Sequence, residues 1–233
     1  MSNNIFKDTI SLISNGIYQV ANLKKGNYDT LAIQYDRLIS NPIYNKLMWG
    51  NSVNDYSAFC NRGLESNKGG PIVDIGCGTL SFTYKSYVRN TQKKFFLCDL
   101  SLEMLQLGKR RIDKSLENNA DITFIRADAL KLPFKDNSIE TALLFGIFHI
   151  FDEPDKLIQE TMRILQPGGK IFLSSLCNDR KLSSAYLNLL QKKNHVASPK
   201  NSTEIRKIIE SNEIIIDDLN VKGGMTYIFG HKK

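Results

Sequence analysis

The residues with the clearest chemical potential lie in two turns, each of which follows a short apolar run. The first turn contains the sequence Val73-Asp74-Ile75-Gly76-Cys77-Gly78-Thr79. Glycines there let a ligand lie against the backbone, because a side chain would block its approach. Asp99 ends the next apolar run, 21 residues after Gly78, where a carboxylate can accept hydrogen bonds from both ribose hydroxyls. The two turns predict a site for an adenosine-type ligand, although the glycine motif alone also fits an ordinary strand-to-helix turn.

Two classes of adenosine-type ligand fit this pattern: a nicotinamide or flavin dinucleotide, and another adenosine-bearing cofactor. A dinucleotide fingerprint needs a third glycine at position 81, which is Ser81 here. Dinucleotide domains also usually begin near their first strand, whereas about 70 residues precede this one. Both observations favour the second class.

Short apolar runs alternate with helical stretches between residues 71 and 176, and these elements must position the two turns. The apolar runs cover 71–73, 95–98, 122–125, 139–145 and 170–175, and the helical stretches lie around 81–90, 101–116 and 154–166. Strands and helices that alternate in this way form a parallel sheet with helices on both faces. The sequence therefore predicts an α/β fold with a doubly wound, mostly parallel sheet.

The flanking segments have different patterns. Apolar residues from Phe6 to Val20 recur at spacings of three and four, as they do beyond residue 27, so we expect a helical cover from residue 4 to about residue 66. After residue 176 the sequence predicts helices over 182–191 and 201–210. An antiparallel hairpin should follow, with its turn at 222–224.

Composition limits the class of protein. The chain has 233 residues, 42% hydrophobic and 24% charged, with a net charge of +7, which is typical of one globular domain. The charge is spread along the chain, with a modest excess after residue 176, so we do not expect nucleic acid as a partner. The four cysteines lie far apart and form no metal-binding motif, which indicates no metal site and a reducing, cytoplasmic location. No apolar run is long enough to cross a membrane.

Four short motifs follow one another along the chain: DIGCGT at 74–79, CDLS at 98–101, RADA at 126–129 with LPF at 132–134, and RILQPGG at 163–169. Together they resemble the class I S-adenosylmethionine-dependent methyltransferases, in particular methyltransferase type 11 and the ubiquinone/menaquinone C-methyltransferases. The resemblance covers about residues 28–176. It implies a Rossmann-like core over 68–233, with residues 1–67 as an N-terminal helical cap or lid within one domain, and S-adenosylmethionine as cofactor with S-adenosylhomocysteine as product.

The resemblance implies roles for residues around the two turns. Asp74, Gly76 and Gly78 would line the methionine part of the cofactor, and Asp99 would hold the ribose. Tyr35, in a helix that closes over the cofactor, would contact it as well, together with Tyr28. Packing of these tyrosines in the core is the open alternative.

Residues after the second, third and fourth strands receive the remaining roles. Leu100 would pack on the adenine, Asp128 would accept a hydrogen bond from its amino group, and the Ala129 N–H would reach a ring nitrogen. Phe145 and Gly146 would face the sulfonium and the methyl acceptor.

Two positions raise separate questions. Leu80 stands where the family usually has a third glycine, so it could narrow the cofactor pocket or shift the turn. His149 follows the fourth strand at the expected pocket mouth, and its imidazole could act as a general base if the acceptor must lose a proton. A hydrogen-bonded structural histidine is the alternative.

The function expected from these observations is methyl transfer from S-adenosylmethionine to a small-molecule acceptor, aromatic or lipid-like. An RNA or protein methyltransferase and a non-catalytic cofactor-binding protein are the alternatives. A homodimer could form through the expected helix over residues 6–20. The acceptor atom, whether oxygen, nitrogen or carbon, is not specified by the sequence.

Overall fold

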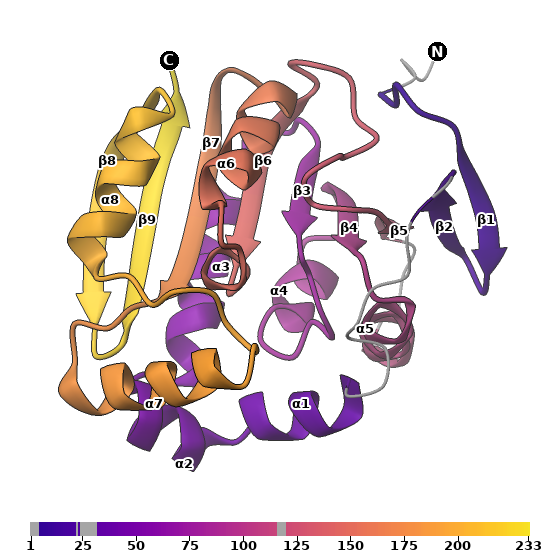
Figure 1. The fold of residues 1–233 in the computed structure, drawn as a ribbon. Coiled ribbons are helices and arrows are strands. Elements are labelled where there is room, and N and C mark those ends of the chain that lie inside the picture. The colour runs from indigo at the N-terminus through magenta and orange to yellow at the C-terminus, as the bar shows by residue number, and fades with distance from the viewer. Residues whose placement is uncertain (1–4, 22, 24–31, 116–119) are drawn as a thin grey trace.

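The computed structural model describes residues 5–21, 23, 32–115 and 120–233. These residues form one mixed sheet of nine strands, in the order β1-β2-β5-β4-β3-β6-β7-β9-β8 (Figure 1). The strands are β1 (Ile10–Ser14), β2 (Ile17–Val20), β3 (Ile72–Ile75), β4 (Lys94–Asp99), β5 (Asp121–Arg126), β6 (Ile139–Phe145), β7 (Leu165–Leu176), β8 (Ile214–Lys222) and β9 (Met225–Lys232).

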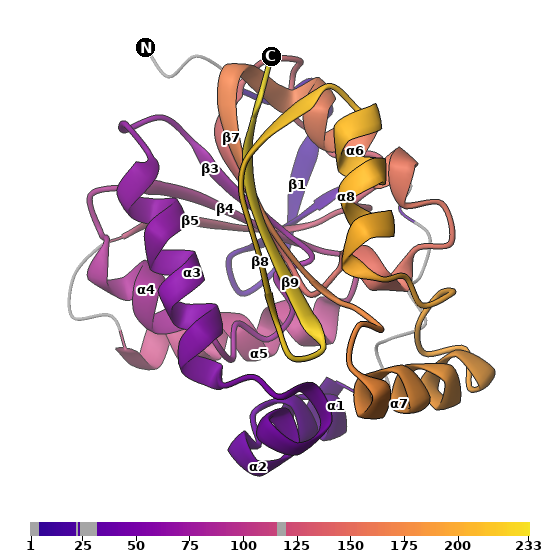
Figure 2. The ribbon, with the colours of Figure 1, turned by 90° about the vertical axis from the view of Figure 1, so that its left-hand side faces the viewer.

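Helices cover both faces of the sheet and one of its ends. They are α1 (Ala32–Ile39), α2 (Pro42–Tyr44), the π-helix η1 (Asn45–Trp49), α3 (Val53–Ser66), α4 (Tyr84–Arg89), α5 (Leu102–Ser115), the 3-10 helix η2 (Phe148–Ile150), α6 (Pro154–Ile164), α7 (Lys181–Lys192) and α8 (Ser202–Ser211). Figure 2 shows α3 and α4 on one side of the sheet and α6 and α8 on the other. Helices α1, α2 and α7 lie beneath the carboxyl ends of the strands (Figure 1).

The predicted α/β architecture is confirmed. Strands β5, β4, β3, β6 and β7 run parallel to their neighbours, while β9 pairs antiparallel with both β7 and β8. All four residues of β3 are buried, as expected for a central strand covered on both faces. The sheet order reverses at β3, which lies between β4 and β6. In open α/β sheets, ligands bind beyond the carboxyl ends of the strands at such a switch point.

The two C-terminal elements follow from local sequence. Helix α8 begins with a capping box in which the Asn201 side chain accepts a hydrogen bond from the Glu204 N–H, and Glu204 accepts one from the Asn201 N–H. This arrangement satisfies backbone groups that the first helical turn leaves open. Strands β8 and β9 form the expected hairpin, which turns at Gly223 and Gly224.

The prediction of a helix over residues 6–20 is wrong. The segment forms an antiparallel hairpin in which Ser14 pairs with Ile17 and the turn consists of Asn15 and Gly16, both with positive φ. This two-residue Asn-Gly turn matches the twist of paired strands and favours a hairpin. Its preference prevails over the helix that the three-and-four spacing of apolar residues predicts. Strand β2 then pairs parallel with β5. The helical prediction holds over residues 32–66, and a boundary at residue 67 stays a prediction.

The hairpin should contribute to global stability. We expect Ile17→Ala to lower the free energy of unfolding by about 3 kcal/mol, because Ile17 is fully buried in the core. The matched change Ile13→Ala, on the exposed strand β1, should cost less than about 1 kcal/mol. Urea unfolding measures both values, and a negligible effect of Ile17→Ala would contradict the placement of β2 in the sheet.

Candidate active site

The turn after β3 is bonded directly to the neighbouring strand. The N–H groups of Gly76 and Cys77 both donate to the Cys98 carbonyl oxygen, at 2.8 and 2.9 Å. Gly76 and Gly78 adopt left-handed conformations, with φ of +70° and +55°. A Cβ at Gly76 would lie 2.3 Å from Cδ1 of Ile147, whereas a Cβ at Gly78 would meet nothing within 4 Å. Gly76 is therefore required by packing, and Gly78 leaves open space beside the backbone.

Asp99 holds this turn at its far end. Its Oδ2 accepts a hydrogen bond from the Gly78 N–H at 2.8 Å, and its Oδ1 accepts one from the Ser101 N–H at 2.9 Å. A carboxylate oxygen can accept more than one hydrogen bond, so these contacts orient Asp99 without exhausting its capacity for hydroxyl donors. The arrangement fits the two hydroxyls of a ribose.

Leu80 keeps the conformation that a glycine would adopt. Its φ is +59°, and its side chain is only 2% exposed. The side chain packs against α5 at Gly108, where an added Cβ would lie 3.0 Å from Cγ of Leu80. The turn is thus not displaced by the missing glycine, because the leucine side chain enters the core and the small residue on α5 makes room for it.

Asp74 is the buried acid of the site. Its Oδ2 accepts a hydrogen bond from the Tyr87 hydroxyl at 2.7 Å, while Oδ1 is buried and has no hydrogen-bond partner within the described part of the chain. Burial raises the pKa of Asp74 to about 7, against the effect of the Tyr87 hydrogen bond and with a smaller contribution from the charge of Asp99. An unpartnered buried carboxylate oxygen is costly, and a proton on Asp74 reduces this cost.

The residues assigned to the adenine lie on two adjacent strand ends. The Ala127 N–H donates to the Asp99 carbonyl oxygen at 3.0 Å, which joins the segments after β4 and β5. Leu100, Asp128 and Ala129 are all half-buried there. Asp128 Oδ1 accepts a hydrogen bond from the Leu130 N–H at 2.9 Å, which fixes the turn that carries it. The structure therefore brings these three residues next to Asp99.

The end of β6 forms the other side of the site. Phe145 is half-buried, and its ring lies 5.7 Å from that of Phe59. Gly146 has a φ of +71°, and a Cβ there would meet nothing within 4 Å. The Gly146 N–H donates to the Ser174 carbonyl oxygen at 3.0 Å. Gly78 and Gly146 thus follow two strands that pair side by side, and each leaves open space beside its backbone.

His149 lies just beyond, on η2. Its Nδ1 accepts a hydrogen bond from the Leu176 N–H at 3.4 Å, and its carbonyl oxygen accepts one from the Ala197 N–H at 3.0 Å. Burial lowers the pKa of His149 to about 4. The imidazole is therefore neutral at pH 7, and the bond at Nδ1 places its proton on Nε2.

An aspartate that the sequence reasoning did not select, Asp36, ties α1 to the glycine turn. It accepts hydrogen bonds from Thr79 and Ser81 and forms an ion pair with Arg111 of α5 at 2.5 Å. Burial acts to raise the pKa of Asp36, but the hydrogen bonds and the charge of Arg111 outweigh it and lower the pKa. The sequence carries no signal for this contact, because its partners lie 43 to 75 residues away. Tyr28 and the side chain of Tyr35 lie outside the described residues.

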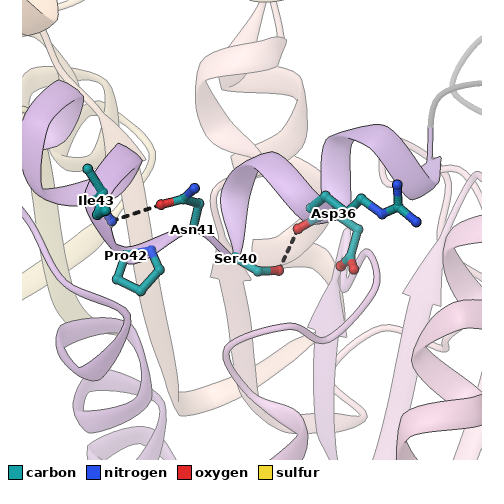
Figure 3. Close-up of a pocket in the computed structure, with 6 residues that line it drawn as sticks. Asp36, Ser40, Asn41, Pro42 and Ile43 are labelled. Atoms are coloured by element: carbon teal, nitrogen blue, oxygen red, sulfur yellow. Dashed lines mark hydrogen bonds between the residues drawn. The ribbon is translucent and has the colours of Figure 1, made fainter.

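Helix α1 and the start of α2 line an open depression. It is lined by Asp36, Arg37, Ser40, Asn41, Pro42 and Ile43 (Figure 3). Asn41 caps α2 by accepting hydrogen bonds from the Ile43 and Tyr44 N–H groups, and Ser40 donates to the Asp36 carbonyl oxygen. Two of the lining residues, Asp36 and Ser40, also contact Ser81, which follows the glycine turn.

Comparison with known proteins points to the same part of the chain. Residues 73–173 match a family described as a methyltransferase domain. The matched range begins in β3, contains the glycine turn, Asp99, Asp128 and Gly146, and ends in β7. Residues 73–173 are therefore similar to a methyltransferase domain.

Two curated relatives share this methyltransferase domain. A demethylmenaquinone methyltransferase of Paenarthrobacter aurescens is 32% identical over 53% of this chain and 47% of its own length. A ubiquinone/menaquinone biosynthesis C-methyltransferase of Hahella chejuensis is 34% identical over 45% of this chain and 42% of its own length. The chain thus spans about half the length of these curated relatives.

A solved structure extends the comparison of folds. A Haemonchus contortus phospholethanolamine N-methyltransferase 2, in complex with phosphomonomethylethanolamine and S-adenosylhomocysteine, aligns with a TM-score of 0.67. The alignment covers 88% of this chain and 58% of that chain at 18% identity, which establishes the common fold. Over the described residues, no helix of this chain is long and apolar enough to cross a membrane. The same residues contain no cluster of histidine, cysteine or acidic side chains suited to a metal ion.

The left-handed conformation of Leu80 predicts an unusual order of stability for its glycine and alanine variants. Both Leu80→Gly and Leu80→Ala lose the buried side chain, and each should lower the free energy of unfolding by about 2 to 4 kcal/mol. Alanine keeps the strain of a left-handed residue, whereas glycine releases about 1 kcal/mol of it. We therefore expect the glycine variant to be the more stable of the two by urea unfolding. A more stable alanine variant would contradict the strained conformation.

Proposed function

We propose that this protein is an enzyme that transfers a methyl group from S-adenosylmethionine to a small-molecule acceptor. The observation that carries the proposal is the open space beside Gly78 and Gly146, next to the Asp99 carboxylate that holds the glycine turn. The methyltransferase family match over the same residues supports it. The open space and the acidic groups fit a ligand with a ribose and an ammonium group.

Each part of the cofactor has a group that could bind it. We assign the ribose hydroxyls to Asp99 and the adenine to Leu100, Asp128 and Ala129. We assign the ammonium group of the methionine part to Asp74. The bound cofactor supplies an activated methyl group on a sulfonium, so the protein chiefly has to orient the acceptor and exclude water. The turn is fixed before binding by the bonds to Cys98 and Asp99, which reduces the ordering cost of binding.

The acceptor side is aromatic with a few polar groups. The Phe59 ring lies next to Phe145 and 5.2 Å from the Tyr227 ring, and Tyr227 accepts a hydrogen bond from the Asn51 amide. The Asn51 carbonyl oxygen and the Ser174 hydroxyl are buried without a partner in the described part of the chain. An aromatic acceptor would suit these neighbours of Phe145, and the two curated relatives are named as a demethylmenaquinone methyltransferase and a ubiquinone/menaquinone biosynthesis C-methyltransferase.

The base role of His149 remains part of the proposal. A neutral imidazole is in the correct state to receive a proton, but a pKa of about 4 makes it a weak base. The proposal therefore favours an acceptor whose proton becomes acidic as the methyl group is transferred. In the tautomer set by the Leu176 N–H, Nε2 can also donate a hydrogen bond that orients the acceptor.

We propose neither a nucleic acid nor a second copy of the chain as a binding partner. The helix over residues 6–20, through which a homodimer was expected, is instead a hairpin in the sheet. A cytoplasmic location stays an expectation from the cysteine pattern.

The proposal is tested by cofactor-induced stabilisation. We expect S-adenosylhomocysteine to raise the Tm of the wild-type protein, because a ligand that binds only the folded state stabilises it. Asp99→Ala should abolish the shift, whereas the matched variant Asp121→Ala, at the opposite end of the strands, should retain it. No shift in the wild-type protein would refute the proposal.

The raised pKa of Asp74 predicts a pH dependence of cofactor binding. Below its pKa of about 7 the free protein holds a proton on Asp74, and a cationic ammonium group beside the carboxyl favours the ionised form. Binding therefore releases a proton, so the affinity for S-adenosylhomocysteine should rise with pH between 5.5 and 7, by up to about tenfold per unit, and level off above. Calorimetric titrations measure the trend, and Asp74→Asn should remove it. An affinity that falls with pH in this range would contradict the assignment.

A further inference from the structure

The helices beneath the carboxyl ends of the strands expose several apolar side chains. We call α1, α2, η1 and α7 the lid layer. Figures 1 and 2 both show α1, α2 and α7 together at this end of the molecule. Exposed large aliphatic residues come from all four segments; Ile43 is 75% and Leu47 56% exposed. The others are Ile33, Leu38, Leu182 and Leu189. Six of the eleven exposed large hydrophobic residues recorded in the described part of the chain therefore belong to this layer.

The same layer carries charge of a single sign. Segments 37–49 and 180–200 contain no acidic residue and seven basic ones: Arg37, Lys46, Arg180, Lys181, Lys192, Lys193 and Lys200. Among the described residues none of these seven forms an ion pair with a carboxylate. The only acidic residue within α1 is Asp36, which points inward to Arg111. Half of the ten basic residues that follow residue 176 thus lie in the segment 180–200, which contains α7.

The lid layer is fixed to the body of the protein from its inner side. Arg180 donates a hydrogen bond to the Leu47 carbonyl oxygen at 2.8 Å, and Ser183 donates to the Met48 carbonyl oxygen at 2.7 Å. The Gly224 N–H donates to the Trp49 carbonyl oxygen at 2.7 Å. These bonds and the Asp36–Arg111 ion pair hold the inner surface, so the exposed aliphatic residues are not needed to attach the layer to the sheet.

We propose that the outer surface of the lid layer docks on an anionic lipid bilayer. Exposed aliphatic side chains can enter the headgroup region, and lysine and arginine residues around them are attracted to anionic lipids. The combination distinguishes a bilayer from other partners. A nucleic acid would use the basic groups but gain little from Ile43 and Leu47, and a second copy of the same surface would place like charges opposite each other. Docked in this way, the protein turns the site beneath its strands toward the membrane.

The experiment is sedimentation of the whole protein with vesicles of phosphatidylcholine alone and of phosphatidylcholine with about 30% phosphatidylglycerol. We expect binding to the anionic vesicles that weakens in high salt. The pair Lys192→Gln and Lys193→Gln should reduce the partition coefficient about 30-fold, because each basic group near the surface contributes about 1 kcal/mol. The pair Ile43→Ser and Leu47→Ser should reduce it about tenfold.

Matched controls change the same residue types elsewhere on the exposed surface. Leu130→Ser with Val221→Ser, and Lys131→Gln with Lys207→Gln, should leave vesicle binding unchanged. Thermal unfolding checks that every variant is folded. The proposal would be overturned if the protein did not bind anionic vesicles, or if the lid variants and the control variants had equal effects. It would also be overturned if the protein formed a dimer in place of vesicle binding and this dimer dissociated in the Ile43/Leu47 variant. RNA binding without vesicle binding would do the same. Because no methyl transfer is measured, the result is independent of the proposed function.

Discussion

The turn between β3 and α4 must accommodate three residues with positive φ within five positions: Gly76, Gly78 and Leu80. Such a path is costly for any residue other than glycine, so it persists only where neighbouring groups hold it. Two backbone bonds to the Cys98 carbonyl oxygen and one bond to the Asp99 side chain provide this support from β4. The carboxylate that fixes the turn is also the group to which we assign the ribose, so under this proposal the turn and the ligand site cannot be changed separately.

The same turn connects the site to the layers around it. On one side Leu80 packs into the core beneath α5, against Gly108. On the other side Thr79 and Ser81 donate hydrogen bonds to Asp36 of α1, which is in turn paired with Arg111 of α5. A helix that covers the carboxyl ends of the strands is thereby attached to the turn itself. The inner surface of the lid layer is thus committed to the site, while its outer surface is free to contact another partner.

Much of this arrangement could be predicted from the sequence because it depends on local patterns. Short apolar runs followed by glycine or aspartate indicate strand ends, and parallel strands bring those ends to one edge, which is why the sequence places Gly78, Asp99 and Asp128 at the same edge of the sheet. The hairpin over residues 10–20 does not follow from the apolar spacing, which is also typical of a helix. Only the Asn15-Gly16 turn indicates a hairpin there. The contact between Asp36 and Arg111 joins residues 75 positions apart, and only the tertiary fold brings them together. The effect of Leu80 likewise depended on Gly108, a partner that spacing does not reveal.

The central claim is that the turn after β3 is a preformed cradle for the cofactor, oriented by Asp99. A crystal structure of the protein with S-adenosylhomocysteine tests this claim most directly. The account predicts ribose hydroxyls within hydrogen-bond distance of the Asp99 carboxylate, with Gly76, Gly78 and Leu80 retaining their positive φ values. A ligand bound away from this turn, or a turn that rearranges to admit it, would contradict the account.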